Sequence, residues 1–169
     1  MASIYSVYVL ITSTRVKSWR SVEKGILLIR RRIKEIGWDP DIVIGLGVGG
    51  AVVGAMLAGS LGRKRIVGID RRYKWVKGAR KAFVDIPTDL VLNPPPRKVI
   101  LVTGEIYTGE TIKTAIDYVK SKLNCELKTA AMYVSENSDY YPDFYAYLIE
   151  KRINPPWRLK GYPRDSKID

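Results

Sequence analysis

The chain has 169 residues and a mass of 19.1 kDa, which suits one domain over residues 1–169 and leaves little for a second. Its hydrophobic fraction of 46% excludes a disordered chain, and no apolar run reaches the roughly 18 residues of a membrane span. The net charge is +12, with no histidine and a single cysteine, Cys125. These counts exclude an internal disulfide, a histidine-based catalytic triad and a zinc site built from histidines or several cysteines.

The positive charge is unevenly distributed. Nine Lys and Arg residues fall between positions 63 and 81, against one acid, Asp70. Two interpretations stay open for this segment: it binds phosphate, from a small ligand or a nucleic acid, or it is a solvated surface.

The N-terminal stretch lacks the basic region and cleavage site of a signal peptide. We therefore expect a cytoplasmic protein with no membrane partner, in which Cys125 is inert.

Strand and helix patterns alternate along the first half of the chain, which predicts an α/β sheet with helices on its faces. Ser18 is a suitable N-cap for a helix whose apolar residues recur at helical spacing, and Gly37 is expected to end it. The predicted elements, in chain order, are a strand at 4–12, a helix from 18 to 36, a strand at 41–46, a glycine-rich turn at 47–50, a helix at 51–61 and a strand at 65–69.

The second half continues the alternation. Residues 98–102 are apolar throughout and give the strongest signal for a buried parallel strand. The tail from Asp139 is rich in Tyr and Pro, and no strand is predicted there. The remaining predictions are an exposed loop at 71–81, two short strands at 82–86 and 89–92, a proline-rich linker at 93–96, an amphipathic helix at 110–123 and a last core strand at 127–134.

Two turns stand between a predicted strand and a predicted helix, where free backbone N–H groups and the helix dipole favour an anion. The first is Gly47-Val48-Gly49-Gly50. Glycine lets the backbone approach a ligand closely, but a tight packing turn explains the pattern equally well. The turn is not a dinucleotide fingerprint, because Val53 stands where the third glycine would be.

The second turn is Thr108-Gly109-Glu110-Thr111. Two hydroxyls and several N–H groups at a helix start can surround a monophosphate. The alternative is structural, with Thr108 as a simple N-cap. No Gly-Lys-Ser/Thr follows, so the turn is not a P-loop.

Taken in order, several segments resemble the type I phosphoribosyltransferases, and most closely the small archaeal and bacterial 6-oxopurine enzymes. The resemblance covers nearly the whole chain. It rests on Ser18-Trp19, on 40–45 before the Gly-Gly turn, on Val-Ile-Leu-Val at 99–102 followed by Thr-Gly-Glu-Thr at 108–111, and on the segments 140–145 and 151–157. It implies a parallel-sheet fold with helices on both faces and a small hood.

The resemblance also implies a site. The turn of Thr108, Gly109, Glu110 and Thr111 would hold the 5′-phosphate of phosphoribosyl pyrophosphate or a purine nucleotide. The implied pyrophosphate site consists of Gly47, Val48, Gly49 and Gly50 with Arg71 and Arg72. A flap over the site would cover approximately 71–97. The base pocket would lie within approximately 139–160 and include Arg152, Ile153 and Trp157. Mg²⁺ and a homodimer are further expectations, as is a glycosyltransferase role in nucleotide metabolism.

The chain departs from the family where chemistry occurs. The two adjacent acids that bind the ribose hydroxyls are replaced by Thr103 and Gly104, and Glu105 comes one place late. A one-residue slip along an extended strand is expected to aim a side chain at the other face. Tyr107 stands where 6-oxopurine enzymes have an acid that handles the base proton.

Two binding positions also differ, since Val48 replaces a basic residue and Arg152 replaces an aromatic one. The leading hypothesis is transfer of phosphoribose to a purine, with Glu105 and Tyr107 as tentative catalytic residues. The alternative is a catalytically silent nucleotide-binding regulator that contacts nucleic acid through its basic face.

Overall fold

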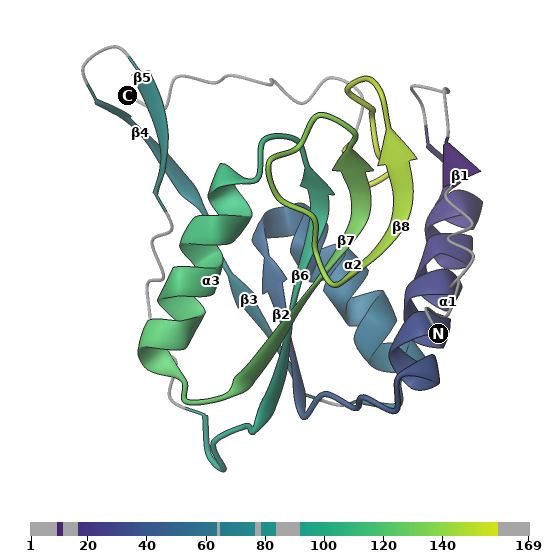
Figure 1. Cartoon of the computed structure of the whole chain (residues 1–169), viewed down its shortest axis with the longest axis vertical. Helices are drawn as coiled ribbons and strands as arrows, with labels where there is room; N and C mark the ends of the chain where they lie inside the picture. The colour runs from purple at the N-terminus through teal and green to yellow at the C-terminus, as the bar shows by residue number, and fades with distance from the viewer. Residues whose placement is uncertain (1–9, 12–16, 64, 77–78, 84–91, 159–169) are drawn as a thin grey trace, which may run out of the picture.

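The computed structural model describes residues 10–11, 17–63, 65–76, 79–83 and 92–158 (Figure 1). A six-stranded sheet forms its centre, in the order β1-β8-β7-β6-β2-β3, and every neighbouring pair of these strands is parallel. The strands are β1 (Leu10–Ile11), β2 (Ile42–Leu46), β3 (Ile66–Ile69), β6 (Lys98–Ile106), β7 (Glu126–Ser135) and β8 (Phe144–Ile149).

Helices cover both faces of this sheet, as predicted. They are α1 (Trp19–Glu35), α2 (Gly47–Ser60) and α3 (Glu110–Lys122). One apolar core lies between the sheet and the helices α1 and α2, and a second lies under α3 on the opposite face (Figure 1). Because β2 and β6 are buried from both sides, their residues are apolar almost throughout.

A two-stranded antiparallel hairpin, β4 (Arg72–Val76) and β5 (Ala79–Phe83), stands apart from the sheet. In Figure 1 it projects past α3 at the end of the molecule toward which the strands of the main sheet point. The exposed loop predicted for 71–81 is therefore wrong. Alternation of Tyr, Trp and Val with basic residues is a strand pattern that the high charge concealed. The short strands predicted at 82–86 and 89–92 fall largely outside the described residues.

Two further predictions need correction. The glycine-rich segment at 47–50 is not a turn before α2 but its first helical turn, because the helix begins at Gly47 directly after β2. The strand at 127–134 is not the last core strand, since β8 follows it. Tyr and Pro flank β8, but Phe144–Ile149 itself is apolar and aromatic, which suits a mostly buried strand.

The helix predicted from Ser18 is confirmed, and the Ser18 hydroxyl accepts a hydrogen bond from the backbone N–H of Ser21. Trp19 and Ile36, at the two ends of the apolar pattern, are exposed rather than inward. The predicted strand at 4–12 corresponds to β1, and its other residues lie outside the described part of the chain. Among the helices that the structure describes, none is long and apolar enough to cross a membrane.

Candidate active site

The order of the strands reverses between β2 and β6. From β2 the chain passes through α2 to β3 on one side, and from β6 it passes through α3 to β7 on the other. Open α/β sheets bind ligands beyond the carboxyl ends of the strands at such a switch point. Here α2 and α3 both begin at that end, so the two helix N-termini lie on either side of the crevice.

The N-terminus of α3 is the more open of the two. Gly109 is its N-cap, with a φ of 92°, and glycine has no side chain that can cap the helix. The backbone N–H of Glu110 lies 3.5 Å from the Thr108 hydroxyl, which is at the limit of a hydrogen bond. Thr108 is exposed and Thr111 half-buried. N–H groups, hydroxyls and the positive end of the helix dipole therefore meet at 108–111.

Gly109 also has a packing reason to be glycine. A Cβ added there would lie 2.6 Å from the Cβ of Tyr140, in the loop between β7 and β8. Tyr140 is held in turn by a 2.9 Å hydrogen bond between its hydroxyl and that of Thr129. The loop after β7 thus fixes the position of the α3 N-terminus.

The N-terminus of α2 is tightly packed against β6. A Cβ at Gly50 would lie 2.3 Å from the carbonyl oxygen of Val102, and a Cβ at Gly49 would lie 3.1 Å from the indole nitrogen of Trp157. The packing alternative considered for this segment holds for two of its residues, and ligand binding stays a prediction. Gly49 and Gly50 are packing residues, whereas Val48 projects outward with 73% of its surface exposed.

Glu105 lies on the same side of the sheet as Gly104, which corrects the expectation that it points to the other face. A Cβ added at Gly104 would meet Trp157, and the carboxylate of Glu105 interacts with the same Trp157 side chain. The strict alternation of side chains between the two faces of the sheet fails toward the carboxyl ends of β6 and β7. On β7, Met132 and the Glu105 partner Tyr133 both belong to the core of α1 and α2. One extended segment cannot place neighbouring side chains on one face without such a break.

The Glu105 carboxylate is enclosed by donors. Its side chain is 6% exposed and forms a 2.8 Å ion pair with Nη2 of Arg158. Burial of the carboxyl raises the pKa of Glu105 above its ordinary value, and the guanidinium groups of Arg158 and Arg71 offset this only in part. Interaction with the side chains of Tyr107 and Trp157 lowers the pKa of Glu105 less than these guanidinium groups do.

Tyr107 connects this carboxylate to the C-terminal segment. Its hydroxyl accepts a 3.3 Å hydrogen bond from the backbone N–H of Ile153. The guanidinium carbon of Arg152 lies 5.0 Å from the centre of its ring. Burial, followed by the charge of Glu105, raises the pKa of Tyr107 above its ordinary value. The phenol is therefore neutral at neutral pH and is not a base there.

The residues predicted for the base pocket have different surroundings. Arg152 is exposed beside Tyr107, and Trp157 covers Gly49 and Gly104 and packs against Tyr133 at 6.2 Å. Ile153, only 4% exposed, belongs to the core under α1 and α2. The structure thus places Trp157 against Gly49 and Gly104 and gives Ile153 a packing role.

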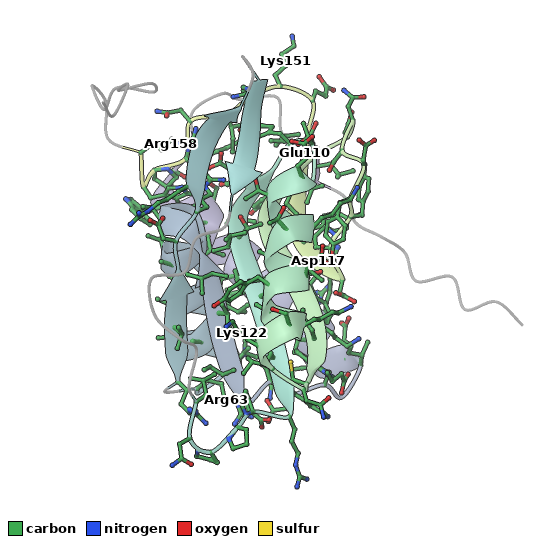
Figure 2. The ribbon with its side chains drawn as sticks, turned by 90° about the vertical axis from the view of Figure 1, so that its left-hand side faces the viewer. Arg63, Glu110, Asp117, Lys122, Lys151 and Arg158 are labelled. Atoms are coloured by element: carbon green, nitrogen blue, oxygen red, sulfur yellow. The ribbon has the colours of Figure 1, made fainter. Side chains whose placement is uncertain are left out.

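Arg71 reaches the same crevice from the end of β3. A Cβ added at Gly47 would lie 3.3 Å from its Nε, and its charge acts on Glu105. Arg72 is exposed at the start of β4. Arg158 is the functional candidate that sequence reasoning missed, because 53 residues separate it from Glu105 and no local pattern connects them. Figure 2 shows Arg158 and Glu110 toward one end of the molecule and Arg63 at the other.

Mg²⁺, which the resemblance implies, prefers oxygen ligands and usually one or two carboxylates. In the part of the chain that the structure describes, no three His, Cys, Asp or Glu side chains lie close enough to hold a metal ion. Thr103 is buried and Gly104 has no side chain, while the Glu105 carboxylate is already paired with Arg158. The residues present do not fit a divalent cation.

Known structures share this fold. A purine phosphoribosyltransferase from Pyrococcus horikoshii Ot3 is 26% identical, with a TM-score of 0.73 over 90% of this chain and 97% of that one. The xanthine-guanine-hypoxanthine phosphoribosyltransferase of Helicobacter pylori gives 16% identity and a TM-score of 0.69, over 85% and 92% of the two chains. A hypothetical protein from Neisseria gonorrhoeae with bound ppGpp gives 16% identity and a TM-score of 0.76, over 89% and 93%.

No curated protein matches the sequence. Residues 15–167, which are nearly the whole chain, match the phosphoribosyl transferase domain family. That match spans all the main helices and all the strands after β1, including both helix N-termini at the switch point. The chain therefore belongs to the phosphoribosyl transferase domain family.

Proposed function

We propose that the protein transfers the phosphoribosyl group of phosphoribosyl pyrophosphate to a purine base. The observation that carries this proposal is the pair of helix N-termini at the β2–β6 switch point, with the Thr108 and Thr111 hydroxyls at one of them. Phosphate binding needs those N–H groups and hydroxyls, and the chain retains them. Family membership and the purine enzyme from Pyrococcus horikoshii support a purine as the acceptor.

In this proposal the 5′-phosphate binds at 108–111, and the pyrophosphate lies near 47–50 and Arg71. The bond from ribose C1′ to the pyrophosphate oxygen breaks and a bond from C1′ to a purine nitrogen forms, with that nitrogen losing its proton to solvent. Glu105, on the side of Gly104, stabilises the positive charge that develops at C1′. Tyr107, neutral and hydrogen-bonded, positions Glu105 and the 152–153 backbone.

The flap at 71–97, a base pocket within 139–160, a homodimer and a cytoplasmic location belong to the same proposal. The β4–β5 hairpin lies within that flap and stands at the end of the molecule toward which the strands of the main sheet point (Figure 1).

A second function, a catalytically silent nucleotide-binding regulator, is favoured by one observation. The Arg158–Glu105 ion pair neutralises the carboxylate that the transferase mechanism requires.

The deciding experiment incubates the protein with phosphoribosyl pyrophosphate and hypoxanthine, guanine, xanthine or adenine, with and without Mg²⁺, and measures nucleotide by chromatography. Product with one base is expected, and Glu105→Gln should lower the rate by about a hundredfold, the order expected for loss of one charge-stabilising group. Glu136→Gln, an exposed acid in the loop after β7, is the matched control. Nucleotide binding without product for any base would favour the silent regulator.

A further inference from the structure

We propose that this site binds its phosphorylated sugar ligand without a divalent cation, because Arg158 and Arg71 supply the positive charge that a metal would provide. The inference rests on the proposed function, since it concerns how phosphoribosyl pyrophosphate is held. It assigns a role to Arg158, which lies in the segment after β8.

The first step in the argument is that position 104 has no room for a carboxylate. An added Cβ would lie 2.9 Å from Cζ2 of Trp157 and 3.0 Å from the Cα of Gly49. Real Cβ atoms do not approach carbon atoms this closely. Thr103 is neutral and 4% exposed. The strand end therefore carries one acid, Glu105, at the place where a metal–sugar complex would need two.

The second step is that Glu105 is already occupied. The Arg158 guanidinium donates a hydrogen bond to the Glu105 carboxylate, and the Tyr107 and Trp157 side chains also interact with it. A cation that approached Glu105 would have to displace a guanidinium at 2.8 Å and would be repelled by its charge. The carboxylate is thus adapted to hold an arginine and not a metal ion.

The third step is the convergence of positive groups around the crevice. Arg158 lies on one side of Glu105, and Arg71 reaches the N-terminus of α2, with its Nε 3.3 Å from the Cβ position of Gly47. The N-terminus of α2 adds the partial positive charge of its dipole. A guanidinium presents parallel donors that match phosphate oxygens, so two arginines can neutralise a diphosphate directly.

Arg158 can bind a phosphate without leaving Glu105. The Arg158 side chain is 39% exposed, whereas that of Glu105 is 6% exposed. Its Nη2 pairs with Glu105, and its other guanidinium N–H groups are available to donate to an incoming phosphate while that pair is kept. The ion pair thus holds the arginine in place for the ligand.

Calorimetric titration of the full chain with phosphoribosyl pyrophosphate, in EDTA and in MgCl₂, tests the inference. We expect the two dissociation constants to agree within about threefold, because the positive charge comes from the protein. Binding more than about tenfold tighter in MgCl₂ would overturn metal independence and leave the proposed function standing. No binding in either buffer would overturn the proposed function, and this inference with it.

Variants of Arg158 test whether this arginine binds the ligand. Arg158→Gln should weaken phosphoribosyl pyrophosphate binding in EDTA at least about tenfold, the scale of one charge-assisted hydrogen bond. Ribose 5-phosphate, which carries only the phosphate assigned to 108–111, should bind the variant as it binds the wild type. Arg158→Lys should recover part of the affinity, and Lys24→Gln, exposed on α1, should change nothing. Unchanged binding in a folded Arg158→Gln protein would overturn the role of Arg158.

Discussion

The two helix N-termini at the switch point arise from the same arrangement, a buried parallel strand followed directly by a helix, yet they differ in what surrounds them. At the start of α2, Gly49 and Gly50 pack against Trp157 and the β6 backbone. At the start of α3, Thr108 and Glu110 are exposed. At the start of α2 the packing covers Gly49 and Gly50 and leaves Val48 exposed, whereas at the start of α3 the helix end itself is exposed.

This difference shows that a glycine-rich strand-to-helix segment does not by itself identify a binding site. The glycines of α2 allow backbone and indole to come close, whereas Gly109 allows a positive φ that turns the chain into α3. What separates the two roles is which residues cover the helix start, and those come from distant parts of the chain.

The largest expected effect is on the stability of the protein, at the packed N-terminus of α2. Gly50→Ala should lower the free energy of unfolding by about 3 kcal/mol, because the added Cβ collides with a backbone carbonyl that cannot move freely. The matched control is Gly59→Ala in the same helix, where a Cβ meets nothing within 4 Å, and which should gain about 0.5–1 kcal/mol. Urea unfolding measures both. Equal effects would mean that the α2 N-terminus is not closed by packing.

The second largest effect is on ligand binding, at the exposed N-terminus of α3. Thr108→Val together with Thr111→Val should weaken ribose 5-phosphate at least about tenfold, because two hydroxyl donors to a charged phosphate are lost. Stability should change little. Thr114→Val is the control, since the Thr114 hydroxyl donates to the Glu110 carbonyl within α3. Calorimetry measures affinity, and an unchanged affinity in the double variant would remove the phosphate assignment.

The smallest expected effect is a gain in affinity for phosphoribosyl pyrophosphate. Val48 is exposed at the start of α2, where the family has a basic residue, so Val48→Lys should tighten phosphoribosyl pyrophosphate binding by about threefold, as one added partly solvated charge would. Leu27→Lys, exposed on α1, adds the same charge far from the crevice and should have no effect. If both variants bind equally, the α2 N-terminus takes no part in holding the ligand.

Local patterns were sufficient for much of the fold. The apolar strand at 98–102 and the helices with periodic apolar faces were predicted close to their observed positions, because burial there follows from neighbours along the chain. The β4–β5 hairpin and β8 were missed. In both, charge or flanking Tyr and Pro masked a strand that pairs with partners the sequence does not indicate.

The phosphate site proposed at 108–111 depends on one segment, and the sequence predicts the helix start there, which the structure has at Glu110. The orientation of Glu105 was not predictable, because it depends on a break in alternation that β6 shares with Met132 and Tyr133 of β7. Arg158 could not be found either, since its partner lies 53 residues away. Contacts that join distant segments are set by the whole fold and leave no local periodicity.

The close approach of Gly104 to Trp157 and Gly49 also constrains how this sequence can change. An aspartate introduced at position 104 would collide with the indole and crowd the Gly49 backbone, so replacing Trp157 by a smaller residue would not by itself make room for it. Replacing Trp157 would also remove its interaction with Glu105. Each single substitution toward an acidic pair at positions 104 and 105 is thus unfavourable by itself.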